Sequence, residues 1–388
     1  MKSSTRSYLD QIREKVKVVS AAQLETWIQS DSLVVIDVRE QEELLQGIIP
    51  RSIHISRGFL ELDIEEHVKD KDHRIVVYCA AGLRSALAAD TLNTLGYSNV
   101  FSLEGGIAQW INQGKKTETP TTLSPQDRIR YQRHIIIPEI GETGQLKLLN
   151  SKVLIIGAGG LGCPTALYLG AAGVGTIGIV DFDKVEESNL HRQILHTPAR
   201  IGTYKTESAK TALIEYNPNL NVICHTERLS VENAESLIRN YDLVIDGSDN
   251  FQTRYLINDI SVQLGVPVVH GSVFRFEGQV SLFDPTAPNS PCYRCLYPAP
   301  PPAHLAPTCK DAGVLGILPG IIGLFQANEA IKRILQIGSP LSGRLLQFDA
   351  LDSKVQEFRI KKNPNCNCCV QKNFESNTKD LSQGNCRI

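Results

Sequence analysis

The segment Lys152-Val-Leu-Ile-Ile-Gly-Ala-Gly-Gly-Leu-Gly162 decides the fold of most of this 388-residue chain. Its residues 153–156 form an apolar run typical of a buried parallel strand. The glycines that follow have the G-x-G-x-x-G spacing of a phosphate-binding turn, and they are Gly157, Gly159, Gly160 and Gly162. Asp181, 24 residues after Gly157, is well placed to bind a ribose hydroxyl. Taken alone, these residues favour a NAD-binding protein.

Strands and helices are expected to alternate after this segment, which predicts a mostly parallel sheet. The further strands are expected at residues 176–181, 242–246 and 266–270. A helix is expected at 124–134, where Ser124 and Pro125 suit an N-cap and a first turn. The apolar run at 312–325 is too short to span a bilayer and contains Pro319, so we expect a buried core helix with a broken start.

A second α/β pattern precedes this one. Short buried strands are expected at 33–37 and 74–79, and a helix at 84–95. The pattern ends near Trp110, and the polar residues after it show no apolar period. The expected division is an N-terminal extension, a first α/β domain, a linker, a second α/β domain and a polar, disordered tail, at 1–17, 18–113, 114–122, 123–370 and 371–388.

The first domain holds a cysteine in a loop that suits anions. Cys79-Ala-Ala-Gly-Leu-Arg-Ser85 lies where a strand gives way to a helix, so backbone N–H groups and the helix dipole converge there. A thiolate at such a place is stabilised and nucleophilic. Gly82 permits the tight turn, and Arg84 is expected to add fixed positive charge. The loop suits a thiolate, a persulfide or an oxyanion, and the alternative is a buried cysteine that only packs.

Polar residues downstream of Asp181 point away from hydride transfer. Candidates for phosphate contacts are Asn189, Arg192, Gln193 and Lys205. Asp183 is a further candidate for binding the cofactor, and the expected strand at 242–246 is followed by two more, Asp249 and Asn250. An enzyme that cleaves a triphosphate needs such groups to hold and neutralise the phosphates. A carboxylate at the carboxyl edge of the sheet suits Mg²⁺. A NAD-dependent dehydrogenase with a structural zinc site is the alternative.

Four of the ten cysteines form two C-x-x-C pairs, which are Cys292 with Cys295 and Cys366 with Cys369. Four thiolates suit tetrahedral Zn²⁺, and a filled shell predicts a structural site. Cys368 is adjacent to Cys369 and could replace it as the fourth ligand. Cys163 and Cys224 are expected to be packing residues, and Cys386 a residue of the tail.

Composition excludes several classes of partner. The formal net charge is −2 and no basic run is present, so direct nucleic-acid binding is not expected. The start of the chain is polar and of mixed charge, unlike a signal peptide, and no membrane association is expected. Ten cysteines without a secretory signal favour thiol chemistry or metal binding in the cytoplasm.

Both domains resemble known families. The loop 79–84, the segment Asp37-Val-Arg-Glu40 and the segment 103–110 resemble rhodanese-like sulfurtransferases. This chain departs from that pattern at 47–52, where a usual His and a second Gly are missing, and we expect Asp37 and Arg39 to form a structural ion pair. Residues 123–370 resemble the MoeB/ThiF family, relatives of ubiquitin-activating enzymes, because the glycines, Asp181 and the polar residues occur in order at family spacing.

The second resemblance implies ATP and Mg²⁺ as cofactors, a homodimer and a role for each motif residue. Asp181 would bind the ribose, Asp249 would bind Mg²⁺, and Arg133 would reach the phosphates of the other subunit. The family's zinc cysteines match Cys292, Cys295, Cys366 and Cys369. Contacts to phosphates are implied for Asn189, Arg192, Gln193 and Lys205. Cys309 matches a loop cysteine and is a candidate resolving thiol.

The resemblances together imply a sulfur-transfer enzyme. It would adenylate the C-terminal Gly-Gly of a small ubiquitin-like sulfur carrier, and a persulfide on Cys79 would then give the thiocarboxylate. The sulfur donor would be an upstream persulfide or thiosulfate. Molybdopterin-type cofactor synthesis is the favoured pathway, with thiamine, cysteine and other products left open. An ATP-dependent enzyme acting on tRNA is a further alternative. In this chain the rhodanese-like domain comes first. The familiar fused molybdopterin and thiolation enzymes that it resembles have the reverse domain order.

Overall fold

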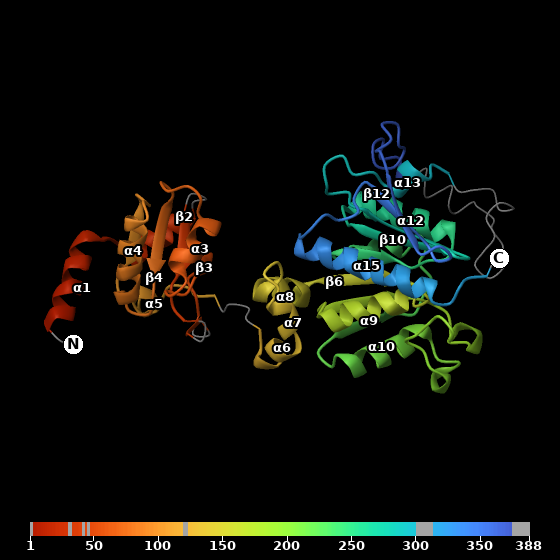
Figure 1. Ribbon diagram of the computed structural model, residues 1–388, viewed down its shortest axis with the longest axis horizontal. Helices are drawn as coiled ribbons and strands as arrows, with labels where there is room; N and C mark the ends of the chain where they lie inside the picture. The colour runs from red at the N-terminus through yellow and green to blue at the C-terminus, as the bar shows by residue number, and fades with distance from the viewer. Residues whose placement is uncertain are drawn as a thin grey trace. The chain divides into compact units, whose positions relative to one another are not determined.

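The computed structural model describes residues 3–29, 33–40, 43–44, 47–118, 123–299 and 313–374. The chain divides into two compact units, Met1–Thr122 and Leu123–Ile388, and each contains one sheet with helices on both faces (Figure 1).

The first unit is built on a five-stranded parallel sheet of order β1-β5-β4-β2-β3. Its strands are β1 Lys17–Val19, β2 Leu33–Asp37, β3 Ser52–His54, β4 Arg74–Tyr78 and β5 Val100–Leu103. Its helices are α1 Ser3–Lys15, α2 Ala21–Ile28, α3 Leu60–His67, α4 Leu83–Thr94 and α5 Gly106–Asn112. Alternate residues of β4 face opposite sides: Val77 packs with α1, α3 and α4, and Val76 packs with α2 and α5.

Segments at both ends of the chain's first unit pack onto it. The segment expected as an extension forms α1, whose Ile12 is buried in the same core as α4. At the other end, Ile48 and Glu118 exchange backbone hydrogen bonds of 2.7 and 2.9 Å, and Trp110 Nε1 donates to the Lys116 carbonyl. Residues 114–118 of the expected linker are therefore held by the first unit.

The second unit is built on an eight-stranded sheet of order β13-β12-β11-β10-β9-β6-β7-β8. The five strands from β10 to β8 are parallel, and β11, β12 and β13 extend the sheet in antiparallel fashion. The strands are β6 Lys152–Ile156, β7 Thr176–Val180, β8 Asn221–His225, β9 Leu243–Asp246, β10 Val268–Phe274, β11 Glu277–Phe283, β12 Arg344–Asp349 and β13 Lys354–Arg359. The predicted fold class is confirmed for both units.

Helices cover both faces of this sheet (Figure 1). They are α6 Pro125–Arg130, α7 Gln132–Ile135, α8 Gly141–Asn150, α9 Gly162–Ala172, α10 Lys205–Tyr216, α11 Ala234–Ile238, α12 Phe251–Leu264, α13 Tyr293–Leu296 and α15 Leu318–Leu335, with short 3₁₀ turns at Glu187–Asn189 and Pro198–Arg200. Ile155 of β6 packs with α9, α10 and α15, whereas its neighbour Leu154 packs with α11 and α12. This alternation fixes which strand residues reach each helix layer.

Two predicted helices differ in detail from the structure. Ser124 caps α6 with a capping box and Pro125 is in its first turn, but the helix ends before Tyr131, which is buried and accepts a hydrogen bond from Asn217 Nδ2. The apolar run at 312–325 leads into α15, a core helix with Pro319 in its first turn. None of the described helices is long and apolar enough to cross a membrane.

Candidate functional site

A cavity of about 700 Å³ lies at the carboxyl ends of β6, β7 and β9. Most of the predicted nucleotide-binding residues line it: Gly157, Gly159, Gly160, Asp181, Asp183, Asn189, Arg192, Gln193, Lys205, Asp249 and Asn250. Gly162 does not line the cavity. It begins α9, and a Cβ there would clash with the Gly157 carbonyl oxygen, so this glycine permits close packing of the turn. The helix start directs its positive dipole end toward the glycine turn.

Asp181 is held by the backbone on both carboxylate oxygens. It accepts hydrogen bonds of 2.8 Å from the N–H groups of Ala158 and Asp183. Burial raises its pKa, and the nearby Lys205 ammonium and these N–H groups oppose that rise. The carboxylate is therefore fixed in orientation beside the glycine turn, as a ribose-binding group must be.

The cations of the cavity are held by local contacts. Lys205 Nζ is 2.8 Å from Asp183 Oδ2, and the lysine side chain is 8% exposed whereas the aspartate is 51% exposed. Arg192 Nη1 donates to the Ser188 carbonyl at 3.1 Å and lies 2.8 Å from His191 Nε2. Both cations thus face a polar cavity in which phosphate oxygens could replace or supplement these partners.

Two buried polar atoms in the cavity wall have no hydrogen-bond partner among the described residues. They are Gln193 Oε1 and Arg254 Nε. Buried polar groups are rarely left unsatisfied, so their presence together indicates a site for a polar ligand. Sequence analysis missed Arg254, which donates to the Ser248 carbonyl at 3.1 Å. Its position one helical turn after Asn250 was the available signal, because that turn starts at the ligand-binding edge of the sheet.

A buried pair fixes the loop that carries Asp249. His270 Nδ1 lies 2.7 Å from Asp246 Oδ2, and the backbone N–H and hydroxyl of Ser248 both donate to Asp246 Oδ1. Burial opposes the charge on Asp246, but the hydrogen bond and charge of His270, together with Arg254 and Ser248, outweigh it and lower the pKa of Asp246. Asp249 is left exposed, and Asn250 begins α12 as its N-cap, with its side chain accepting from the Thr253 N–H.

Two further predicted residues lie elsewhere. Arg133 is on α7, is exposed, and is not among the residues lining the cavity of its own chain. Cys309 and Cys386 lie outside the described residues, as do tail positions 375–388.

In the first unit, Cys79 directly follows β4 and is 1% exposed. Its Sγ accepts a hydrogen bond from the Gly82 N–H at 3.1 Å and lies 3.6 Å from Ser85 Oγ. Ser102 Oγ donates to Ser85 Oγ at 2.9 Å, so the Ser85 hydroxyl hydrogen is free to point at the sulfur. Burial raises the pKa of Cys79, but hydrogen bonds from Ser85 and from the backbone outweigh it, and the net pKa is lowered. The predicted anion cradle therefore consists of neutral donors.

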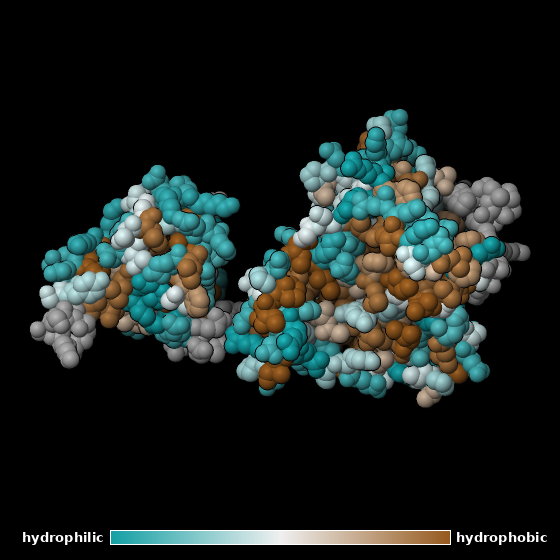
Figure 2. All heavy atoms as spheres, viewed as in Figure 1, coloured by the Kyte–Doolittle hydropathy of each residue, from teal (hydrophilic) through white to brown (hydrophobic). Residues whose placement is uncertain are grey.

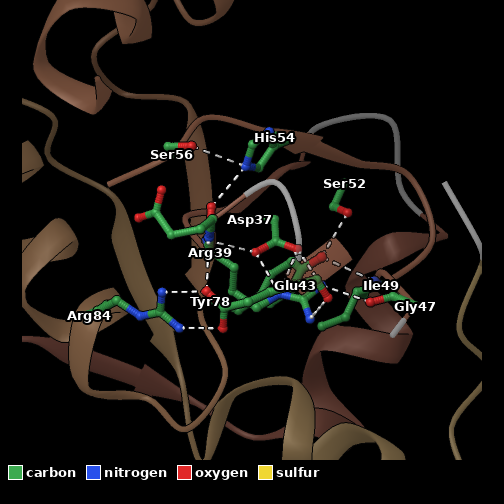
Figure 3. A network of polar contacts seen from close by, with 11 residues as sticks. Asp37, Arg39, Glu43, Gly47, Ile49, Ser52, His54, Ser56, Tyr78 and Arg84 are labelled. Atoms are coloured by element: carbon green, nitrogen blue, oxygen red, sulfur yellow. Dashed lines mark hydrogen bonds and ion pairs between the residues drawn. The ribbon is translucent and has the colours of Figure 1, made fainter. Parts of the chain in front are cut away.

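Arg84, which was expected to add fixed positive charge to this loop, is paired with an acidic side chain. Its Nη1 and Nη2 donate to the two carboxylate oxygens of Glu43 at 2.6 and 2.7 Å (Figure 3). This hydrogen-bonded pair lowers the pKa of Glu43 to about 2 and raises the pKa of Arg84. The charge of the arginine is thus balanced by a residue 41 positions away in sequence.

The expected ion pair of Asp37 and Arg39 is confirmed. The two side chains are buried and 2.7 Å apart, and Arg39 also donates to the Gly47 carbonyl at 2.7 Å (Figure 3). The Tyr78 hydroxyl accepts from the Ile49 N–H in the same network. These contacts hold the segment that departs from the rhodanese pattern, and they do not involve Cys79.

The four cysteines of the two C-x-x-C pairs come together. Their sulfur atoms all lie within 4.8 Å of one another, and three of the separations are 3.5, 3.6 and 3.9 Å. A tetrahedron with metal–sulfur bonds of about 2.3 Å has edges of roughly 3.8 Å, so the spacing fits zinc. The Asn363 N–H donates to the Cys295 sulfur, and such outer contacts orient metal ligands.

Cys368 points to a different partner. Its sulfur accepts from Asn258 Nδ2 at 3.4 Å, and Cys369 completes the tetrad. Asn258 also accepts from the Tyr293 N–H, and its neighbour Asp259 pairs with Arg294 at 2.7 Å. Helix α12 thus runs from the nucleotide cavity at its first turn to the cysteine cluster near its last. Sequence analysis missed these two anchors.

The positions of Cys368 and Cys369 lead to opposite expectations for substitution. Cys369→Ser is expected to lose most of the bound metal, because one of four thiolate ligands is removed. Cys368→Ser is expected to keep about one metal per chain, since its sulfur faces Asn258. Elemental analysis of the two purified variants is the measurement. Full metal in Cys369→Ser together with loss in Cys368→Ser would reverse the assignment.

The parallel sheet, the glycine turn and this cavity define a nucleotide-binding α/β protein. The sequence profile of the ThiF family matches residues 131–369, and the chain belongs to this family. The profile of the rhodanese-like domain matches residues 20–113. The predicted families of both units are therefore confirmed. The glycine turn and Asp181 alone did not exclude a dehydrogenase. The family match covers the whole second sheet and favours the ThiF family over that alternative.

Curated relatives match a large part of this chain. The Drosophila ananassae protein named adenylyltransferase and sulfurtransferase MOCS3 is 51% identical over 250 residues, which are 64% of this chain and 55% of that protein. The Mycobacterium tuberculosis protein named probable adenylyltransferase/sulfurtransferase MoeZ is 51% identical over 249 residues, 64% of each chain. This chain therefore spans less than two thirds of the length of either relative.

Solved structures share the fold at low identity. The crystal structure of E. coli MccB with ATP has a TM-score of 0.52 and 22% identity, covering 62% of this chain and 74% of that chain. The crystal structure of PaaA has a TM-score of 0.54 and 22% identity, covering 71% of this chain and 83% of that chain. At this identity the likeness shows the fold alone.

Proposed function

We propose that this chain adenylates the C-terminal carboxylate of a small ubiquitin-like carrier ending in Gly-Gly and replaces the adenylate by sulfur from Cys79. The observation that carries the proposal is the cavity of the ThiF-family unit, where cations, Asp181 and Asp249 line one space. A rhodanese-like unit with a stabilised thiolate in the same chain supports the second step. The names of the relatives are consistent with both steps.

In the first step, the carrier carboxylate attacks the α-phosphorus of ATP and pyrophosphate leaves. Asp181 would hold the ribose, and Arg192 and Lys205 would neutralise charge on the phosphates. Asn189, Gln193 and Asn250 line the same space and could donate to phosphate oxygens. The carrier then carries AMP as a good leaving group on its acyl carbon.

In the second step, a Cys79 persulfide attacks that acyl carbon and AMP leaves, which gives an acyl disulfide. A second thiol then attacks the Cys79 sulfur, so that the thiocarboxylate leaves and a disulfide remains on Cys79. Cys309 is the proposed second thiol, although it lies outside the described residues. A cellular thiol reductant must reduce that disulfide before another turnover.

Two metal ions are part of the proposal. Asp249, exposed in the cavity, would hold Mg²⁺, which would supply charge neutralisation for the phosphates. Cys292, Cys295, Cys366 and Cys369 would hold Zn²⁺ in a closed tetrahedral shell, with a structural role only. The proposed compartment is the cytoplasm, and the favoured pathway is molybdopterin-type cofactor synthesis.

We also propose that the second unit forms a homodimer through α6 and α7. Ile129 is 80% exposed and Ile136 is 63% exposed on either side of Arg133. Hydrophobic side chains are visible over the region of α6 to α8 (Figure 2). Arg133 does not line the cavity of its own chain, and the apolar residues on either side of it are exposed. Both observations support burial of this surface against a second copy of the chain.

Mixed dimers test whether Arg133 acts on the partner's cavity. Arg133→Ala and Lys205→Ala are each expected to be inactive as homodimers, because each removes a phosphate contact from every site. A heterodimer of the two would carry both losses in one site and neither in the other, so about half of the activity should return. Pyrophosphate exchange after verified subunit mixing is the measurement. If the heterodimer shows no recovery of activity, Arg133 does not act on the cavity of the partner subunit.

Carrier-dependent pyrophosphate exchange tests the function as a whole. The full chain, with ATP and a native Gly-Gly carrier, is expected to exchange labelled pyrophosphate into ATP. A carrier with an amidated C-terminus is the matched control and is expected to support no exchange, because its terminus cannot attack phosphorus. Exchange that is independent of the carrier, or NAD binding without exchange, would overturn the proposal.

A further inference from the structure

The Cys79 loop stabilises its thiolate without a net positive charge. The donors to the sulfur are the Gly82 N–H and the Ser85 hydroxyl, both of which are neutral. The charged group of the loop, Arg84, is engaged on both terminal nitrogens by Glu43. The negative charges of Cys79 and Glu40 also act on this guanidinium. The loop therefore stabilises one anionic sulfur. Its cation, Arg84, is already paired and is not available to bind a second anion.

This balance affects sulfur donors differently according to their charge. Thiosulfate is a dianion, and the cation of this loop, Arg84, is already engaged by Glu43 at 2.6 and 2.7 Å. Approach would place two negative charges near both the thiolate and the Glu43 carboxylate, which is costly at a partly buried site. An organic persulfide brings at most one negative charge, and its outer sulfur can use the backbone donors of the cradle.

We propose that Glu43 sets the donor specificity of this domain, excluding small inorganic dianions and leaving organic persulfides, R–S–SH, as the substrate class. The inference rests on the proposed sulfur transfer and names the donor that the function leaves open. Glu43 acts through Arg84 and is a specificity-determining residue that does not itself touch the reacting sulfur.

The step is a simple exchange of one sulfur atom. The Cys79 thiolate attacks the outer sulfur of R–S–SH, a bond forms between the two sulfurs, and the donor S–S bond breaks. The electron pair leaves on R–S⁻, and the proton stays with the transferred sulfur or passes to the departing thiolate. No external oxidant or reductant is required.

The test is the rate at which full-length protein gains one sulfur atom on Cys79 in a single turnover, followed by mass spectrometry. Three donors are compared: thiosulfate, the persulfide of N-acetylcysteamine, whose tail is uncharged, and persulfidated serum albumin. The wild-type chain is expected to react faster with persulfides than with thiosulfate. The two persulfide arms show whether a small molecule or a protein delivers the sulfur.

The decisive variant is Glu43→Gln, which frees the Arg84 charge. The ratio of thiosulfate rate to persulfide rate is expected to rise by about tenfold or more, the scale of a hydrogen bond regained by a charged group. The double variant Glu43→Gln/Arg84→Gln is expected to lose that gain. Glu61→Gln is the matched control, because it breaks another Arg–Glu pair of the same unit, at 2.7 Å, that does not involve the loop.

A second measurement needs no variant. Sulfate, an inert dianion of similar shape, is expected not to protect Cys79 of the wild-type chain from alkylation by iodoacetamide. Strong protection by sulfate, equal wild-type rates with thiosulfate and persulfides, or an unchanged ratio in Glu43→Gln would each overturn the inference alone. A wild-type Cys79 that accepts sulfur from none of the donors would overturn the proposed sulfur transfer, and the inference with it.

Discussion

Cys79→Ala is expected to abolish thiocarboxylate formation while leaving carrier-dependent pyrophosphate exchange intact. The proposed adenylation would use the cavity of the second unit, and Cys79 belongs to the first. Two other described cysteines, Cys163 and Cys224, cannot replace it. Burial raises the pKa of Cys163 to about 12 and that of Cys224 to about 11, so both are thiols at neutral pH. The pKa of Cys79 is lowered instead.

The mass of the carrier gives the measurement. With wild-type protein, ATP and a persulfide donor, the carrier should gain the mass difference between sulfur and oxygen, and with Cys79→Ala it should not. Cys224→Ala is the matched control and should behave like the wild type, because Cys224 only donates weakly to the Thr206 carbonyl. Thiocarboxylate formed by Cys79→Ala at the wild-type rate would remove the first unit from the sulfur pathway.

Asp249→Ala is expected to slow pyrophosphate exchange by about a hundredfold or more, which is the scale for loss of one main electrostatic group. Asp249 is exposed at the cavity edge, whereas the nearby Asp246 is buried and engaged by His270 and Ser248. Loss of the Asp249 carboxylate would therefore remove the proposed Mg²⁺ ligand, and Asp246 could not replace it without breaking the loop.

Exchange rates measured over a range of Mg²⁺ concentrations test this role. If Asp249→Ala only weakens the positioning of the metal, its exchange rate should partly recover at high Mg²⁺. A general folding defect would not be corrected in this way. Asp242→Ala, at the other end of β9, is the control, since that carboxylate accepts from the Lys152 N–H and does not line the nucleotide cavity. A wild-type rate in Asp249→Ala would show that another group holds the ion.

The features that could be predicted from sequence are those with short-range signals. The strands at 33–37 and 152–156 were predicted at the residues where they occur, because a short apolar run has few other stable arrangements in a soluble domain. The position of the cavity could also be predicted, because the spacing of the glycines in the turn is a short-range signal. The antiparallel strand β13 was missed because all six of its residues are exposed, which removes the apolar alternation that marks a strand.

The features that could not be predicted depend on partners far apart in sequence. Nothing near Arg84 shows that Glu43 would engage it, and the two are brought together only by the fold. Spacing allowed either Cys368 or Cys369 as a metal ligand. The fold brings Cys369 to the other three cysteines of the pairs, whereas Cys368 accepts from Asn258 on α12. The buried pair of His270 and Asp246 was likewise missed, since each residue sits on its own strand.

The cysteine cluster also has a consequence for the order in which the chain folds. Its two halves include Cys292 and Cys366, which are 74 positions apart, and the chain between them contains α15, β12 and β13. Closing an unstructured loop of that length costs about 4 kcal/mol of chain entropy. An unfolded chain would therefore offer a zinc ion two thiolates at a time, and four only after the intervening helix and hairpin have formed. Shortage of the proposed zinc ion would then reduce the yield of correctly folded chains, and it would have less effect on molecules that had already bound the ion.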